Sequence, residues 1–114
     1  MRGNVLNVLV VNKYAYSGDG VNIMRGSIFG NPFRLQDGYS RESAIAAYKE
    51  WLREEYRRKG RVYDALIALT RRVLAGETVV LICCCKPKAC HGDVIHAAIE
   101  ALCAAMSAKN ADRA

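Results

Sequence analysis

The chain has 114 residues, of which 52% are hydrophobic and 25% are charged, with nine glycines and two prolines. This length and composition fit one compact domain, and they exclude a collagen, a disordered tail and a linker-dominated chain. The apolar runs Val8 to Val11 and Val79 to Cys85 are far shorter than the roughly 20 residues of a membrane span. The first residues do not resemble a signal peptide, so we expect a soluble cytoplasmic protein that does not bind membranes.

The charge balance favours an anionic partner. Seventeen Lys and Arg residues outnumber eleven Asp and Glu residues, and the formal net charge is +6. Such an excess suits either nucleic acid or a phosphorylated small molecule. Because the basic residues are spread along the chain rather than gathered in a tail, we expect an anionic small molecule and keep nucleic acid as the alternative.

The first predicted element is a strand at Val5 to Val11, where β-branched residues dominate and polar ones are nearly absent. Val21 to Met24 predicts a short second strand, paired with the first as a hairpin through the turn residues Ser17 to Gly20. The stretch Arg25 to Phe33 has neither helical nor strand periodicity. Its aromatic and aliphatic residues predict a loop that is held in place by packing.

Two amphipathic helices follow this loop. Ser40 is the predicted N-cap of the first helix, whose apolar stripe continues to Lys59. A second apolar stripe starts at Val62 and is closed by Gly76. We therefore expect two consecutive helices between the predicted strands.

Thr78 to Cys85 predicts another buried strand, and Gly92 to about Ala108 predicts a final helix. Buried strands joined by a helical crossover imply a parallel pair. The predicted fold is a small single α/β domain over residues 1–108, with a short, mostly parallel sheet packed by about three helices. Residues 109–114 are expected to form a disordered tail. A sheet with so few strands has exposed edges, which makes a homodimer a reasonable expectation.

Cysteines are the most informative residues. Their number, five, is odd, and with no secretion signal this argues against a disulfide framework. Four of them are crowded together, namely Cys83, Cys84, Cys85 and Cys90. If the strand continues to Cys85, the first and third of the consecutive cysteines share one face and Cys84 takes the other.

The loop after this strand brings Cys90, His91 and Asp93 to the start of the last helix. Ligands of open α/β sheets collect beyond the carboxyl ends of strands, where helix N–H groups favour an anion or a thiolate. We predict these three residues as catalytic. Cys90 would be a nucleophile of lowered thiol pKa, or His91 or Asp93 would act as acid or base.

Two other interpretations of this segment remain open. In the first, zinc binds a tetrahedral set, although its spacing matches no common zinc ribbon and we otherwise predict no metal and no cofactor. The zinc ligands would be Cys83, Cys85, Cys90 and His91. In the second, the cysteines are small hydrophobic core residues, which we favour for Cys84 and Cys103. Asp93 is then a first-turn carboxylate that stabilises the helix.

Two stretches, together with Val10 to Lys13, resemble a known family: Arg25 to Phe33, and Cys83 to Cys85 with Cys90 to Asp93. They are similar to the family catalogued as domain of unknown function 4326, which occurs in bacteria and their phages, and the similarity spans Val8 to Cys103. The family usually has Pro-Trp where this chain has Ile28-Phe29, and Trp in place of the middle cysteine. These departures change packing positions and leave the polar ones intact. The resemblance implies no established reaction.

The resemblance directs attention to the first loop. The guanidinium of Arg25 can hold a phosphate or a carboxylate by two hydrogen bonds, while Phe29 and Phe33 are expected to anchor the loop to the core. The predicted ligand-binding residues are Arg25, Gly26, Ser27, Asn31, Cys85 and Lys86. Together with the first N–H groups of the last helix, Arg25 and Lys86 would hold the phosphate.

We therefore expect a pocket between the two stretches that binds, and hydrolyses or transfers, a nucleotide or nucleoside-like anion. The alternative function is a non-catalytic basic module that binds nucleic acid or a host protein, or a zinc-binding domain.

Overall fold

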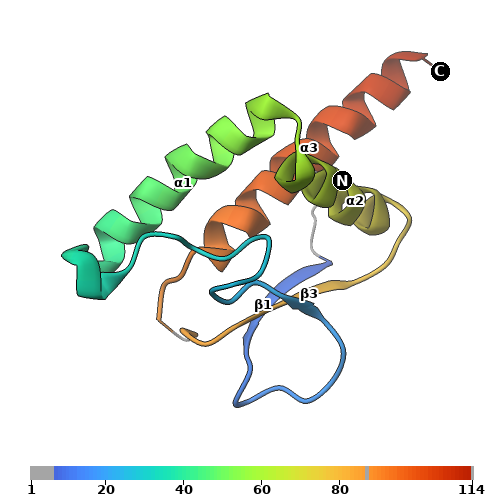
Figure 1. Ribbon diagram of the computed structural model, residues 1–114. Helices are drawn as coiled ribbons and strands as arrows, with labels where there is room; N and C mark the ends of the chain where they lie inside the picture. The colour runs from blue at the N-terminus through green and yellow to red at the C-terminus, as the bar shows by residue number, and fades with distance from the viewer. Residues whose placement is uncertain (1–6, 87, 114) are drawn as a thin grey trace.

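The computed structural model describes residues 7–86 and 88–113 of the chain. It contains a small α/β domain with a three-stranded parallel sheet and three helices, as the sequence predicts (Figure 1). In chain order its elements are β1 (Val8–Asn12), β2 (Val21–Asn22), the 3₁₀ turn η1 (Leu35–Asp37), α1 (Arg41–Arg58), α2 (Arg61–Leu74), β3 (Val79–Cys83) and α3 (Gly92–Arg113). No helix in the described part of the chain combines the length and hydropathy that crossing a membrane requires.

The central strand of the sheet is β3, and the strand order is β1-β3-β2. Both neighbours run parallel to it, so the predicted hairpin between the first two strands is wrong. The chain instead passes to the far edge of β3, where the N–H of Ile23 donates to the carbonyl of Ile82 at 3.1 Å. Gly20 permits this close approach, because a Cβ there would lie 2.9 Å from the carbonyl oxygen of Val80.

The strands are shorter than predicted. β1 begins at Val8 among the described residues, and the predicted start at Val5 lies outside them. β3 ends at Cys83 instead of Cys85. The register with β1 ends at the pair Asn12 and Cys83, and the N–H of Lys13 donates to the Cys83 carbonyl at 2.8 Å.

The helices begin where the sequence predicts. Ser40 caps α1 through a reciprocal pair with Ser43, in which each hydroxyl oxygen accepts the other residue's backbone N–H, at 3.0 and 2.8 Å. Lys59 ends α1 in the left-handed conformation, with φ of 54°. α3 continues to Arg113 across most of the predicted tail, because residues 104–113 contain no glycine or proline to stop it.

The core lies between the helices and the sheet. Alternate residues of β3 are buried, and they belong to one hydrophobic cluster with buried residues of all three helices. The most deeply buried large side chains in these elements are Tyr48, Leu66, Leu81, Ile95 and Ile99. This core fixes the carboxyl end of β3 beside the N-termini of α1 and α3, and the candidate site is at this end.

Candidate functional site

The two predicted stretches meet in space. A hollow of about 420 Å³, here called the loop–turn hollow, lies between the loop that follows β2 and the turn between β3 and α3. Of the predicted site residues, those that line it are Arg25, Asn31, Cys85, Cys90 and His91, and Cys83 of the alternative zinc set lines it as well. Gly26, Ser27, Lys86 and Asp93 are outside its lining. The structure therefore brings together residues that are about 60 positions apart in the sequence, as expected where ligands collect at the carboxyl end of a parallel sheet.

Gly26 and Ser27 shape the loop instead of lining the hollow. The hydroxyl of Ser27 donates to the carbonyl of Met24 at 2.6 Å, and this bond closes a tight turn. Gly26 adopts φ of 93°, a conformation that favours glycine. Further along, a Cβ at Gly30 would lie 2.8 Å from the Met24 carbonyl oxygen. These residues are needed for the path of the main chain.

Asn31 attaches the loop to α1. Its amide nitrogen donates to the carbonyl of Ala44 at 3.4 Å, and its oxygen accepts the N–H of Phe33 at 2.8 Å. Phe29 is buried, as predicted, and its carbonyl accepts the hydroxyl proton of Tyr48 at 2.7 Å. Phe33 is only half-buried and contributes to the lining of the hollow. The loop is consequently fixed by packing and by its own polar groups.

His91 is buried, with 8% of its surface exposed. Its Nε2 lies 2.6 Å from the carbonyl oxygen of Ile23. Since a carbonyl oxygen only accepts, Nε2 must carry the proton, and Nδ1 of the neutral ring keeps a free electron pair. Burial lowers the pKa of His91, and the hydrogen bond to Ile23 only partly opposes this. The imidazole is therefore neutral near pH 7.

Cys90 is 2% exposed, and burial raises the pKa of its thiol to about 12. The predicted lowering of this pKa is wrong. The Gly92 N–H donates to Cys90 Sγ at 3.3 Å and favours the thiolate, but the loss of hydration outweighs it. Cys90 is thus a neutral thiol, unsuited to act as a nucleophile near pH 7.

Lys86 and Asp93 bind each other outside the hollow, with Nζ 2.6 Å from Oδ1. The other carboxylate oxygen of Asp93 accepts the N–H of Cys90 at 3.2 Å. Partial burial opposes ionisation of this carboxyl, but the hydrogen bonds from Lys86 and Cys90 outweigh it and lower the pKa of Asp93. This geometry agrees with the alternative interpretation of Asp93 as a carboxylate that stabilises the helix start.

The first N–H groups of α3 are already bonded within the turn. The N–H of Gly92 donates to Cys90 Sγ, and that of Asp93 donates to the carbonyl of Cys90 at 3.0 Å. The N–H of Val94 donates to the carbonyl of His91, also at 3.0 Å. These N–H groups and Lys86 thus have partners within the chain and lie outside the lining of the hollow, and their binding of a phosphate stays a prediction.

Arg41, which the sequence analysis missed, lines the hollow opposite the turn. Its Nη1 donates to the carbonyl of Ala89 at 3.2 Å, so the first residue of α1 reaches across to the segment before α3. The sequence gives one signal for the position of Arg41: it directly follows the predicted cap Ser40, so it is the first residue of the predicted helix. No acidic side chain is among the lining residues in the described ranges, and nearby Asp37 binds Arg34 at 2.8 Å.

The three consecutive cysteines differ in environment. Cys83, at the end of β3, is buried, Cys84 is exposed and Cys85 is half-buried. The prediction of Cys84 as a core residue is wrong, because the strand ends before it; the same prediction for Cys103 is confirmed. Within residues 7–86 and 88–113, no three His, Cys, Asp or Glu side chains are grouped to hold a metal ion. The alternative zinc set is thus not assembled in this structure.

Comparison with known proteins agrees with the resemblance seen in the sequence. The chain is 40% identical over 87 residues to an uncharacterized 12.4 kDa protein in the nrdA-td intergenic region of Enterobacteria phage T4, covering 75% of this chain and 71% of the relative. No solved structure matches the chain significantly. The sequence profile of the family described as domain of unknown function (DUF4326) matches residues 10–101. This match covers most of the domain, including both stretches that form the loop–turn hollow, and the chain therefore belongs to the DUF4326 family.

Proposed function

We propose that the protein binds a small phosphorylated molecule of the nucleotide class in the loop–turn hollow. The observation that carries this proposal is the convergence of two guanidinium groups, Arg25 and Arg41, on a hollow with no acidic side chain among its described lining residues. Two arginines facing one concave surface provide the charge and the paired donors that a phosphate requires.

The two arginines have different roles in this proposal. Arg41 is held by the Ala89 carbonyl and has further N–H groups to offer, so it is already positioned before a ligand arrives. Arg25 is exposed on the loop and can close over the anion. Apolar groups line another part of the hollow and suit the base or the sugar of a nucleotide: Phe33, Leu35 and Ile45.

For a hydrolysis or a group transfer in this hollow, His91 is the residue that we assign as the base. Nδ1 has a free electron pair, and the low pKa of the buried ring keeps that pair available near pH 7. Cys90 remains protonated and Asp93 lies outside the hollow. The predicted catalytic group of three residues is thereby reduced to one.

Thermal unfolding in the presence of ligands tests the proposal. The probes are AMP, ADP, ATP, NAD, the free nucleosides and inorganic phosphate. A ligand that binds only the folded state stabilises it by about 2.7 kcal/mol at a hundred times its Kd. We expect phosphorylated probes to raise the Tm, and Arg25→Ala and Arg41→Ala to remove the shift.

The matched control is Arg71→Ala, which removes an exposed arginine of α2 that is absent from the lining of the hollow. It should retain the full shift. If no phosphorylated probe raises the Tm, or if Arg25→Ala and Arg41→Ala respond like the control, the proposal is wrong. Binding of long polynucleotides that falls steeply between low and moderate salt would support the nucleic-acid alternative instead.

A further inference from the structure

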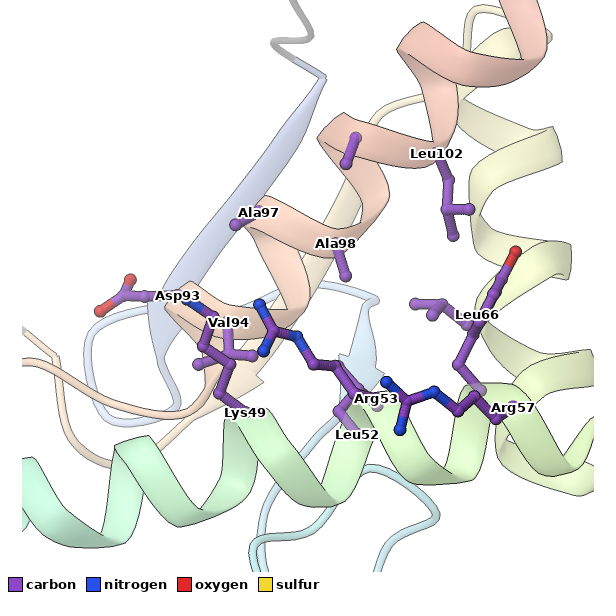
Figure 2. Close-up of a pocket in the computed structure, with 12 residues that line it drawn as sticks. Lys49, Leu52, Arg53, Arg57, Leu66, Asp93, Val94, Ala97, Ala98 and Leu102 are labelled. Atoms are coloured by element: carbon purple, nitrogen blue, oxygen red, sulfur yellow. The ribbon is translucent and has the colours of Figure 1, made fainter.

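A second concave surface lies between α1 and α3, and it is separate from the loop–turn hollow. Figure 2 shows this α1–α3 groove, which has a volume of about 630 Å³. Its apolar lining comes from three helices: Leu52 and Tyr56 of α1, Leu66 of α2, and Val94, Ala98 and Leu102 of α3. Small side chains on the α3 wall, Ala97 and Ala101, keep the groove open.

Basic side chains follow the α1 edge of this groove. Lys49, Arg53 and Arg57 are spaced four residues apart and line the groove. In Figure 2, Lys49 and Arg53 extend from α1 toward α3, and Arg57 runs along α1 toward Arg53. This spacing sets successive charges about 6 Å apart along the helix axis. The ion-pair partners of Arg53 and Arg57 on α1, Glu50 and Glu54, are not among the lining residues.

The acidic charge in the lining of the groove is neutralised by an ion pair. Asp93 is the acidic residue in the described lining, and it is paired with Lys86 at 2.6 Å. The ion pairs of Arg53 and Arg57 with their glutamates are exposed, and exposed pairs are weak enough for another carboxylate to replace them. The groove therefore presents an apolar floor beside a row of cations.

We propose that the α1–α3 groove binds an amphipathic helix of a partner protein, whose apolar stripe is flanked by a row of Asp or Glu residues. An apolar stripe fits the floor, and carboxylates repeated at helical spacing match the row of cations on α1. A single acidic headgroup on an acyl chain would use one of these cations, whereas the row extends over about 12 Å. A second copy of this chain would bring further positive charge, since the net charge is +6.

The test uses labelled synthetic peptides of about 18 residues, roughly five helical turns. One has a leucine stripe flanked by glutamates, the second has lysines in place of the glutamates, and the third has serines in place of the leucines. Fluorescence anisotropy with the full chain measures their Kd. The Glu–Leu peptide is expected to bind about tenfold more tightly than either of the others.

Two charge reversals locate the binding surface. Arg53→Glu, in the middle of the row, should weaken the Glu–Leu peptide by about tenfold. Arg71→Glu makes the same change of net charge on α2, away from the groove lining, and should alter the Kd by less than about twofold. Circular dichroism verifies that both variants are folded.

Equal binding of the Glu and Lys peptides, binding of neither, or an equal loss in the two arginine variants would overturn the proposal. So would displacement of the Glu–Leu peptide by free laurate together with indifference to Arg53→Glu, because that pattern describes an acyl-chain site. Concentration-dependent dimerisation that Arg53→Glu abolishes would identify a second copy as the occupant and would also overturn it.

Discussion

The two walls of the loop–turn hollow differ in what their polar groups do. On the inner wall, His91 is a buried part of the lining, and Tyr48 packs behind it, outside the lining, with the two ring centroids 4.9 Å apart. The His91 and Tyr48 side chains donate hydrogen bonds to main-chain carbonyls of the loop region, those of Ile23 and Phe29. On the outer wall, Arg25 is exposed and Arg41 is half-buried with a single bond to Ala89. The hydrogen bonds of the inner wall therefore hold the site together, with only Nδ1 of His91 left free, and the outer wall keeps donors available for a ligand.

The largest expected effect is behind the inner wall, at Tyr48, which packs against His91. Tyr48→Ala removes a fully buried ring and should cost about 3–5 kcal/mol of unfolding free energy. Tyr48→Phe removes only the hydroxyl, leaves the Phe29 carbonyl without its donor and should cost about 1–3 kcal/mol.

Urea denaturation measures both changes. The matched control is Tyr14→Phe, at a side chain that is 81% exposed, which should change stability by less than about 0.5 kcal/mol. Equal urea midpoints for Tyr48→Phe and wild type would show that the hydrogen bond from Tyr48 to Phe29 does not stabilise the fold. This result would contradict the structural role given to these buried groups.

The cysteines give a second, smaller contrast. Cys90→Ser buries a hydroxyl in place of a thiol and should cost about 1–3 kcal/mol, whereas exposed Cys84→Ser should cost less than about 0.5 kcal/mol. Labelling of the native protein by iodoacetamide, followed by mass spectrometry, should modify Cys84 and leave Cys90 unmodified. Labelling of Cys90 at the rate of Cys84 would contradict its burial.

The smallest expected effect is a pH dependence due to His91. Burial lowers the pKa of the folded imidazole below its usual 6.5, so the unfolded chain binds the proton more readily. The stability that depends on the neutral ring is complete above pH 6.5 and is lost as the pH falls through the lower folded pKa. Urea midpoints between pH 7 and pH 5 should fall more for wild type than for His91→Gln, and parallel curves would contradict the assignment.

The fold could be predicted from local patterns. Ser40 and Gly60 set the bounds of α1 and the start of α2, and the apolar runs located β1 and β3 within a few residues. The hairpin prediction failed because turn residues such as Gly20 indicate only that the chain bends locally. They do not determine which edge of β3 the chain then joins. Long-range contacts determine which strands pair with each other.

For the candidate site, the sequence identified the two stretches but not the state of each side chain. It placed Arg25, Asn31, Cys85, Cys90 and His91 at one site, and these residues do line one hollow. It also placed Lys86 and Asp93 there, although these two groups neutralise each other outside the hollow. Pairing of this kind depends on side-chain directions, which spacing along the chain does not give.

The sequence by itself determined where helices and strands form, because capping residues and apolar periodicity act over a few neighbouring positions. Only the tertiary structure determined which site residues are ionised and which side chains reach the hollow. The pKa of Cys90 depends on how completely the surrounding core excludes water. The contact of Arg41 with Ala89 requires α1 to lie across from the turn before α3. Both result from contacts between segments that are distant in the chain, and no local pattern of residues specifies them.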